Sequence, residues 1–148
     1  MKGRTLMIAL LAFTAVFAAA LWWFTFYAWY ERSEGVGALM VGGAPVPVAD
    51  WQGIDGASSP LKMRGCFTVD PASFAAAEPA ADATPLTAPF WFDCFNAGAI
   101  TEDLANGRAR AYALTRDDPD GFDLMAAIYP DGRGFVWRQL GADYRDQR

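Results

Sequence analysis

The stretch Phe122–Leu140, FDLMAAIYPDGRGFVWRQL, predicts a β-hairpin. Two runs rich in apolar residues, Phe122–Tyr129 and Gly134–Leu140, flank Pro130–Gly132, whose residues favour a tight turn. Two antiparallel strands are therefore expected near the C-terminal end of the sequence.

Three segments upstream extend this expected sheet. Leu61–Val69 alternates in the manner of a strand and places Cys66 near the end of that strand. Ala109–Leu114 is a second expected strand. Ala99–Asn106 predicts a short helix, since it has apolar residues four positions apart and is followed by Gly107. The predicted fold is α+β: a small, mainly antiparallel sheet of four or more strands with one short helix.

Two segments rich in small residues and proline accompany these elements. Residues 31–60 predict a Gly/Pro-rich connector that includes short strands and ends in a loop at Ile54–Pro60, which leaves residues 61–148 as the α+β domain. Asp70–Pro89 consists largely of alanine and proline. We expect it to be a mobile surface excursion with at most one helical turn near Phe74.

The N-terminal residues predict a membrane span. Leu6–Tyr30, LMIALLAFTAVFAAALWWFTFYAWY, contains no charge, proline or glycine. As a helix it would be roughly 37 Å long, enough to cross a hydrocarbon core with some tilt. A cleaved signal peptide is the alternative, because Ala18–Ala20 offers a cleavage site, but the apolar run continues beyond Ala20. We expect a transmembrane helix at residues 6–30.

Charge predicts the orientation of this helix. Lys2 and Arg4 precede the span, so the positive-inside rule makes residues 1–5 a cytoplasmic tail in a bacterial inner membrane and exports residues 31–148 to the periplasm. The exported part holds all 17 acidic residues but only 10 of the 12 basic ones, a net charge of −7. This charge argues against nucleic acid or anionic headgroups as ligands, and it permits a basic periplasmic protein as a partner.

Two sets of side chains on the helix suggest what it recognises. Small residues four positions apart let another helix approach closely, and aromatic residues settle at the level of the lipid headgroups. The predicted packing face is Thr14, Ala15, Ala18 and Ala19. The predicted aromatic belt is Trp22, Trp23, Phe26, Tyr27, Trp29 and Tyr30, with Trp22, Phe26 and Trp29 sharing one face and Trp23, Tyr27 and Tyr30 another. An ordinary lipid-facing anchor remains the alternative to a helix that docks on a partner.

The composition excludes several kinds of chemistry. The sequence has no histidine, which excludes Ser-His-Asp and Cys-His nucleophile pairs within the chain, histidine zinc sites and phosphorylation on histidine. No phosphate-binding loop or G-x-G-x-x-G motif is present. The acidic stretch Arg116–Asp123 does not fit an EF-hand, because the two anchoring positions fall on Arg116 and Ala127, and a solvated connection is expected there. We expect no enzyme activity, no cofactor and no metal.

The two cysteines, Cys66 and Cys94, have three interpretations. A thioredoxin-like site requires C-x-x-C, whereas 27 residues separate these two. A copper site built on two thiolates normally gains histidine or methionine ligands, and no Cys-Met cluster is evident. An oxidising periplasm permits a disulfide, which would stabilise a small domain by about 3–4 kcal/mol in the chain-entropy model. We expect a structural disulfide, with redox exchange and metal binding as the alternatives.

These features together resemble an uncharacterised family of alphaproteobacterial single-pass membrane proteins. The resemblance rests on Gly53–Leu61, the strand at Cys66 and Phe67, Trp91–Phe95, and Tyr129–Arg133 followed by Val136–Leu140. It implies the topology and fold above and no activity. Members are sometimes labelled histidine kinase, a label that a chain with no histidine and no ATP-binding motif does not support.

The leading hypothesis is a non-enzymatic accessory or assembly subunit of an inner-membrane protein complex, with a respiratory complex as the expected partner. The helix would contact the bilayer and dock on the complex, and the acidic domain would cover its periplasmic side. One alternative is a free-standing periplasmic sensor or adaptor whose ligand pocket is walled by Trp91 and Trp137. A second alternative is a thiol-redox envelope factor that acts through Cys94.

Overall fold

The structure is a computed structural model that describes residues 2–147. The chain divides into two compact units, the residues up to Tyr30 and the residues from Glu31 onward. The folded unit thus begins at Glu31 and not at residue 61, because residues 31–60 contribute strands to it.

Helix α1, Gly3–Phe26, is the first unit's only helix among the described residues. Alanine, leucine and other good helix formers occupy its interior, and none of its residues is buried. Its length and composition allow it to cross a membrane. It ends four residues before the predicted limit, because Tyr27 is the C-cap residue and Tyr30 already belongs to strand β1.

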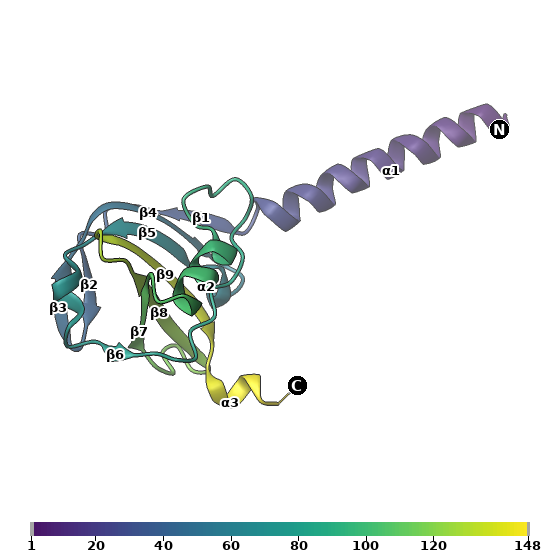
Figure 1. Cartoon of the computed structure of the whole chain (residues 1–148). Coiled ribbons are helices and arrows are strands. Elements are labelled where there is room, and N and C mark those ends of the chain that lie inside the picture. The colour runs from purple at the N-terminus through teal and green to yellow at the C-terminus, as the bar shows by residue number, and fades with distance from the viewer. Residues whose placement is uncertain (1, 148) are drawn as a thin grey trace. The chain divides into compact units, whose positions relative to one another are not determined.

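The second unit is built on a seven-stranded sheet with the strand order β1-β4-β5-β9-β8-β7-β6 (Figure 1). The pairs from β4 to β6 are all antiparallel, which confirms the predicted fold class. The strands are β1 (Tyr30–Ser33), β4 (Ala49–Gly56), β5 (Arg64–Thr68), β6 (Glu78–Pro79), β7 (Arg110–Thr115), β8 (Phe122–Ile128) and β9 (Arg133–Leu140).

The predicted C-terminal hairpin is confirmed as β8 and β9. The two strands pair in register from Phe122 opposite Leu140 to Ile128 opposite Gly134. The turn closes with the Gly132 amide donating to the Tyr129 carbonyl, and Gly132 has φ +94°, a conformation that favours glycine. Gly134 also leaves room for the Phe67 ring, which a Cβ atom at that position would overlap.

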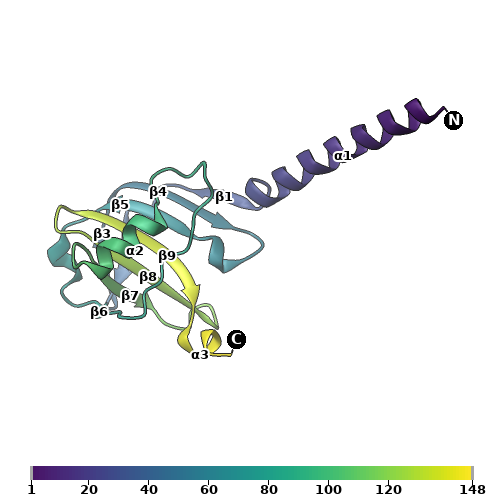
Figure 2. The same cartoon turned by 45° about the vertical axis from the view of Figure 1, so that its right-hand side comes forward.

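Smaller elements surround the sheet. Figure 2 shows α2 lying over the strands β8 and β9. Asn96 caps α2 by accepting a hydrogen bond from the Ala99 amide, so the helix starts two residues before the predicted start. The elements are the hairpin of β2 (Ala38–Val41) and β3 (Ala44–Pro47), the 3-10 helices η1 (Pro60–Lys62) and η2 (Pro71–Phe74), and the helices α2 (Ala97–Ala105) and α3 (Ala142–Arg145).

Apolar side chains cover both faces of the sheet. On one face, β2, β3 and η2 contribute to a core with β5, β8 and β9; its buried members are Val41, Val46, Phe67, Val69, Phe74, Ala77, Ala126, Ile128 and Val136. Neighbouring strand residues point to opposite faces, so Trp137 points away from Val136 and meets Phe95, with 6.2 Å between ring centroids. The sheet is therefore the middle layer of the domain.

Two local predictions are wrong. Ile54–Pro60 was expected to be loop, but β4 runs to Gly56 and pairs with β5. Leu61–Val69 was expected to be one strand with Cys66 near its end, but it begins with η1 and β5 covers only Arg64–Thr68, with Cys66 at its centre. Pro60 begins the short helix, which displaces the start of the strand.

The predicted mobile excursion at Asp70–Pro89 is also wrong. Phe74 has no exposed surface, β6 pairs with β7, and the Ala80 amide donates to the Ala111 carbonyl. Alanine and proline therefore form a packed border of the sheet here.

Candidate functional site

The predicted packing face lies on one side of α1. At 100° per residue, Thr14, Ala15, Ala18 and Ala19 occupy a sector of about 140°. The Thr14 hydroxyl donates to the Leu10 carbonyl at 2.9 Å, so its hydrogen-bonding capacity is used within the helix. The face therefore presents small side chains and no unsatisfied donor, the kind of surface on which another helix can pack closely.

The predicted aromatic belt gathers at the C-terminal end of α1. Trp22 packs on Phe26 with ring centroids 4.6 Å apart, and Trp23 stacks on Tyr27 at 5.2 Å. The predicted continuation of the two helical faces to Trp29 and Tyr30 is wrong, because the helix ends at Phe26. Trp29 instead packs against Phe24, with 6.2 Å between ring centroids. The belt is thus part helix and part turn, and its last member, Tyr30, belongs to β1.

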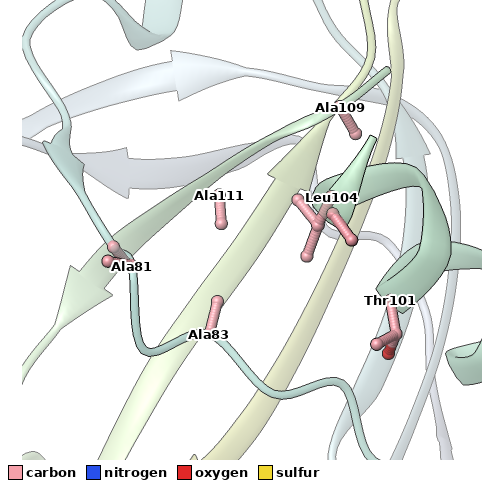
Figure 3. Close-up of a pocket in the computed structure, with 8 residues that line it drawn as sticks. Ala81, Ala83, Thr101, Leu104, Ala109 and Ala111 are labelled. Atoms are coloured by element: carbon pink, nitrogen blue, oxygen red, sulfur yellow. The ribbon is translucent and has the colours of Figure 1, made fainter. Parts of the chain in front are cut away.

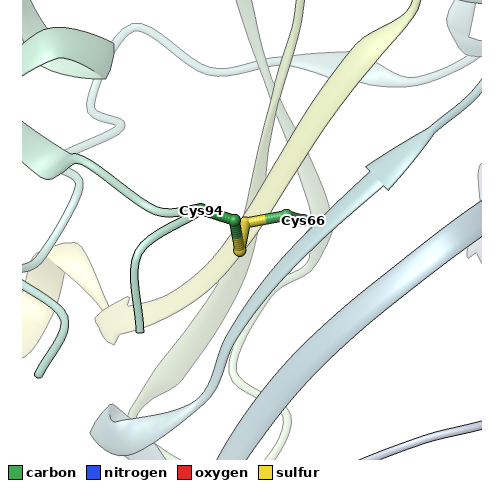
Figure 4. The surroundings of a disulfide bond; sticks show 2 residues. All are labelled: Cys66 and Cys94. Carbon is green, nitrogen blue, oxygen red and sulfur yellow. A yellow bond between two sulfur atoms is a disulfide. The ribbon is translucent and has the colours of Figure 1, made fainter. Parts of the chain in front are cut away.

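The predicted disulfide is present, between Cys66 in β5 and Cys94 in the loop before α2 (Figure 4). The two Cα atoms are 6.3 Å apart. Cys66 is buried and Cys94 is half-buried, between the buried rings of Phe92 and Phe95. The bond thus attaches the loop to the middle of the sheet.

The residues 80–94, here called the 80–94 segment, have no regular secondary structure and are held by side chains of the sheet. Gln139 is buried; its amide nitrogen donates to the Asp82 carbonyl at 3.0 Å, and its amide oxygen accepts from the Thr84 amide at 2.7 Å. Arg64, also buried, donates to the carbonyls of Leu86 and Thr87. Gln139 and Arg64 lie in predicted strands, and nothing in the sequence indicated that their side chains bind the backbone of another segment.

A cluster of charges, missed at the sequence level, fixes the start of this segment. Asp82 accepts from Arg116 at 2.9 Å and from Arg145 at 2.7 Å, and Arg116 also pairs with Glu78 and with the buried Asp123. Hydrogen bonds from Arg116, opposed in part by burial and supported by Arg145, lower the pKa of Asp82 from 3.8 to about 2. The expectation of a solvated connection at Arg116–Asp123 is confirmed for the exposed residues 116–120, but it is wrong for Asp123, which is buried and paired with Arg116.

A second polar group lies at the C-terminal end of α2. The Tyr129 hydroxyl donates to Asp103 at 2.6 Å, and Arg108 donates to the other oxygen of the same carboxylate at 2.6 Å. Burial and then the Asp103 hydrogen bond raise the pKa of Tyr129 to about 12. Tyr129 is buried and its hydroxyl is occupied, so the group joins α2 to the hairpin turn.

The cavities of the domain differ in their lining: one is lined mainly by alanine, and another, of about 500 Å³, is lined in part by arginine and tyrosine. The one in Figure 3 has a volume of about 360 Å³ and lies between α2 and β7; alanine dominates its lining, with Thr101 and Leu104. Trp137 has no exposed surface and so cannot wall an open ligand pocket, as one hypothesis required. Within residues 2–147, no group of three or more cysteine and acidic side chains could hold a metal ion.

Comparison with known proteins places these features in a family. The model of a family of unknown function, DUF6446, matches residues 38–146. The chain belongs to this family. The part of the DUF6446 chain that matches runs from β2 to α3 and includes the disulfide, the charge cluster and the whole 80–94 segment. No curated protein and no solved structure matches the chain.

Proposed function

We propose that this DUF6446 protein is a non-enzymatic accessory or assembly subunit of an inner-membrane protein complex, anchored by α1 with its domain in the periplasm. Respiratory complexes are the first partners to screen. The observation that supports the proposal most is a helix of 24 residues that contains an 18-residue stretch of mean hydropathy 2.2 and has no buried residue. Such a surface requires lipid or another apolar helix around it.

The helix has two distinguishable sides, which favours a specific partner over lipid alone. Between residues 14 and 19 this side carries only the small side chains of Thr14, Ala15, Ala18 and Ala19, whereas Phe13 and Phe17 lie on the other side and are exposed. Leu11 and Trp22 border this small-residue patch, one turn away on the same side. Close packing on the small side is the main source of attraction between helices in lipid, where the hydrophobic effect contributes little.

The polar groups of the domain already serve its packing. The charge cluster around Asp82 and Arg116 holds the 80–94 segment, and the Tyr129–Asp103 pair joins α2 to the hairpin. Their shifted pKa values therefore have a structural explanation and do not call for a catalytic one. Its net charge of −7 favours a partner with basic periplasmic loops.

Purification in a mild detergent tests this proposal. The full chain with a C-terminal tag should be recovered in a particle larger than the monomer and its detergent. The double variant Ala15→Leu/Ala18→Leu should release the partner, because the larger side chains prevent close helix packing. Ala9→Leu/Ala20→Leu is the matched control, since both alanines lie on the opposite side of α1. Recovery of the unaltered chain as a lone monomer would contradict the proposal.

A free-standing periplasmic sensor or adaptor is the second candidate. It is favoured by a groove of about 500 Å³ whose lining includes Tyr112, Tyr129, Arg108 and Arg110. Replacing residues 6–30 by an unrelated transmembrane helix separates the candidates. A sensor keeps its function after this exchange, and a subunit that docks through α1 loses it.

A further inference from the structure

Phe90 is the most exposed large apolar side chain among the described residues from Glu31 onward, with 58 % of its surface exposed. The domain buries Phe67, Phe74, Phe92 and Phe95. Phe90 belongs to a stretch of ten residues without charge, residues 83–92, in a chain in which one residue in five is charged. A single exposed apolar side chain is common on protein surfaces; Phe90 differs in lying within an uncharged stretch, so its position relative to the membrane anchor decides what it can contact.

The loop around Phe90 lies beside the first strand of the domain. The guanidinium carbon of Arg32, in β1, is 5.4 Å from the centroid of the Trp91 ring. Figures 1 and 2 both show the loop before α2 close to β1. Arg32 follows Tyr30, the last residue of the aromatic belt, by two residues, which span at most about 7 Å. Covalent connection therefore limits how far Arg32, and the Trp91 ring beside it, can lie from the last residue of the belt.

The backbone of this loop suits a shallow apolar environment. Pro85 and Pro89 have no N–H group to satisfy, and both are buried. The Leu86 and Thr87 carbonyls accept from Arg64, and the Pro89 carbonyl accepts from the Phe92 amide at 2.9 Å. Because these backbone groups already have hydrogen-bond partners within the protein, moving the loop from water into an apolar environment costs less free energy.

We infer that the loop of residues 87–91 inserts Phe90 into the interface of the lipid bilayer, with Trp91 at headgroup depth, as a second membrane contact beside the anchor. The inference rests on the proposed function insofar as α1 spans the membrane. Aromatic insertion gains its free energy from apolar area and not from headgroup charge, so neutral lipid suffices for a domain of net charge −7. A domain attached at two places cannot rotate freely about its anchor.

Photo-crosslinking of the full chain in phosphatidylcholine vesicles and in membranes of the expressing cells tests the inference. The variant Phe90→p-benzoylphenylalanine keeps an aromatic side chain at an exposed position. The same probe at Met40, which is 55 % exposed on β2, is the matched control, and a probe at Phe17 in α1 reports on the anchor itself. Thermal unfolding checks that each variant is folded.

The expected result is about tenfold more phospholipid adduct, by mass spectrometry, at position 90 than at position 40, in vesicles with and without anionic lipid. Lipid adducts at Phe17 without adducts at position 90 would overturn the inference and leave the anchor intact. A protein adduct in place of lipid at position 90 would also overturn it. Absence of lipid adducts at Phe17 would overturn the anchor and this inference together.

Discussion

The β8–β9 hairpin and the 80–94 segment contact each other, but different interactions hold them. The hairpin is maintained by its own backbone ladder, from Phe122–Leu140 to Ile128–Gly134, and by buried apolar side chains. The 80–94 segment is mostly irregular. Gln139 and Arg64 bind its backbone, and the disulfide fixes its end.

Gln139 shows how a side chain can replace a strand. Its amide donates to the carbonyl of Asp82 and accepts from the N–H of Thr84, two groups that an adjacent β-strand would bind with its own peptide groups. The same amide oxygen accepts from the Trp137 indole at 3.1 Å. The segment thus depends on a few polar side chains, whereas the hairpin depends on its backbone ladder and on buried apolar side chains such as Trp137.

The largest effect is expected from Trp137→Ala, in the hairpin. Trp137 has no exposed surface, so truncation creates a cavity and should lower the free energy of unfolding by about 3–5 kcal/mol. Urea unfolding of the full chain in mild detergent, followed by near-UV circular dichroism, measures this. Trp91→Ala, at a half-buried position of the 80–94 segment, is the control and should cost clearly less. Equal losses would mean that the two regions are equally important for stability.

Removing the disulfide should have the next largest effect. Cys66→Ala/Cys94→Ala should lower the free energy of unfolding by about 3 kcal/mol, because the unfolded chain gains freedom. Hydrogen exchange should accelerate in the 80–94 segment and remain slow in β8 and β9. A thiol-redox factor makes the opposite prediction: Cys94→Ser abolishes its function and leaves the thermal stability unchanged.

The sequence predicted the elements whose evidence is local. The hairpin follows from two apolar runs and a Pro-Asp-Gly turn, and α1 follows from a long run without charge. The disulfide followed from the expected compartment and the lack of other cysteine ligands. Each of these signals lies within a short stretch or in the composition.

The 80–94 segment was predicted poorly because its partners are distant in sequence. Gln139 and Thr84 are 55 residues apart, and Arg145 and Asp82 are 63 residues apart. Alanine and proline show no hydrophobic periodicity, so the burial of Phe74 could not be separated from a loop. The end of α1 was missed for a related reason, since Tyr27–Trp29 form a turn that a continuous apolar run does not mark.

An intermediate effect is expected from Gln139→Leu. The leucine approximates the volume but leaves the Asp82 carbonyl, the Thr84 amide and the Trp137 indole without this partner, which should cost about 2 kcal/mol. Hydrogen exchange should rise at Thr84 and its neighbours before it rises in the hairpin. Gln52→Leu, at an exposed position of β4, should change the stability by less than about 0.5 kcal/mol. Unchanged exchange at Thr84 would show that Arg64 and the disulfide suffice.

The smallest effect is expected on how the free energy of unfolding depends on pH. The folded-state pKa of Asp82 is about 2, below its ordinary value of 3.8, so its carboxylate stabilises the fold above about pH 4 and loses that contribution as the pH falls toward 2. Because Asp82 is partly exposed, the loss should be about 1–2 kcal/mol. Asp82→Asn should therefore be less stable at pH 6, and its stability should decline less between pH 5 and pH 2 than that of the unaltered chain. Parallel declines would show that the ion pairs with Arg116 and Arg145 contribute nothing to holding the 80–94 segment on the sheet.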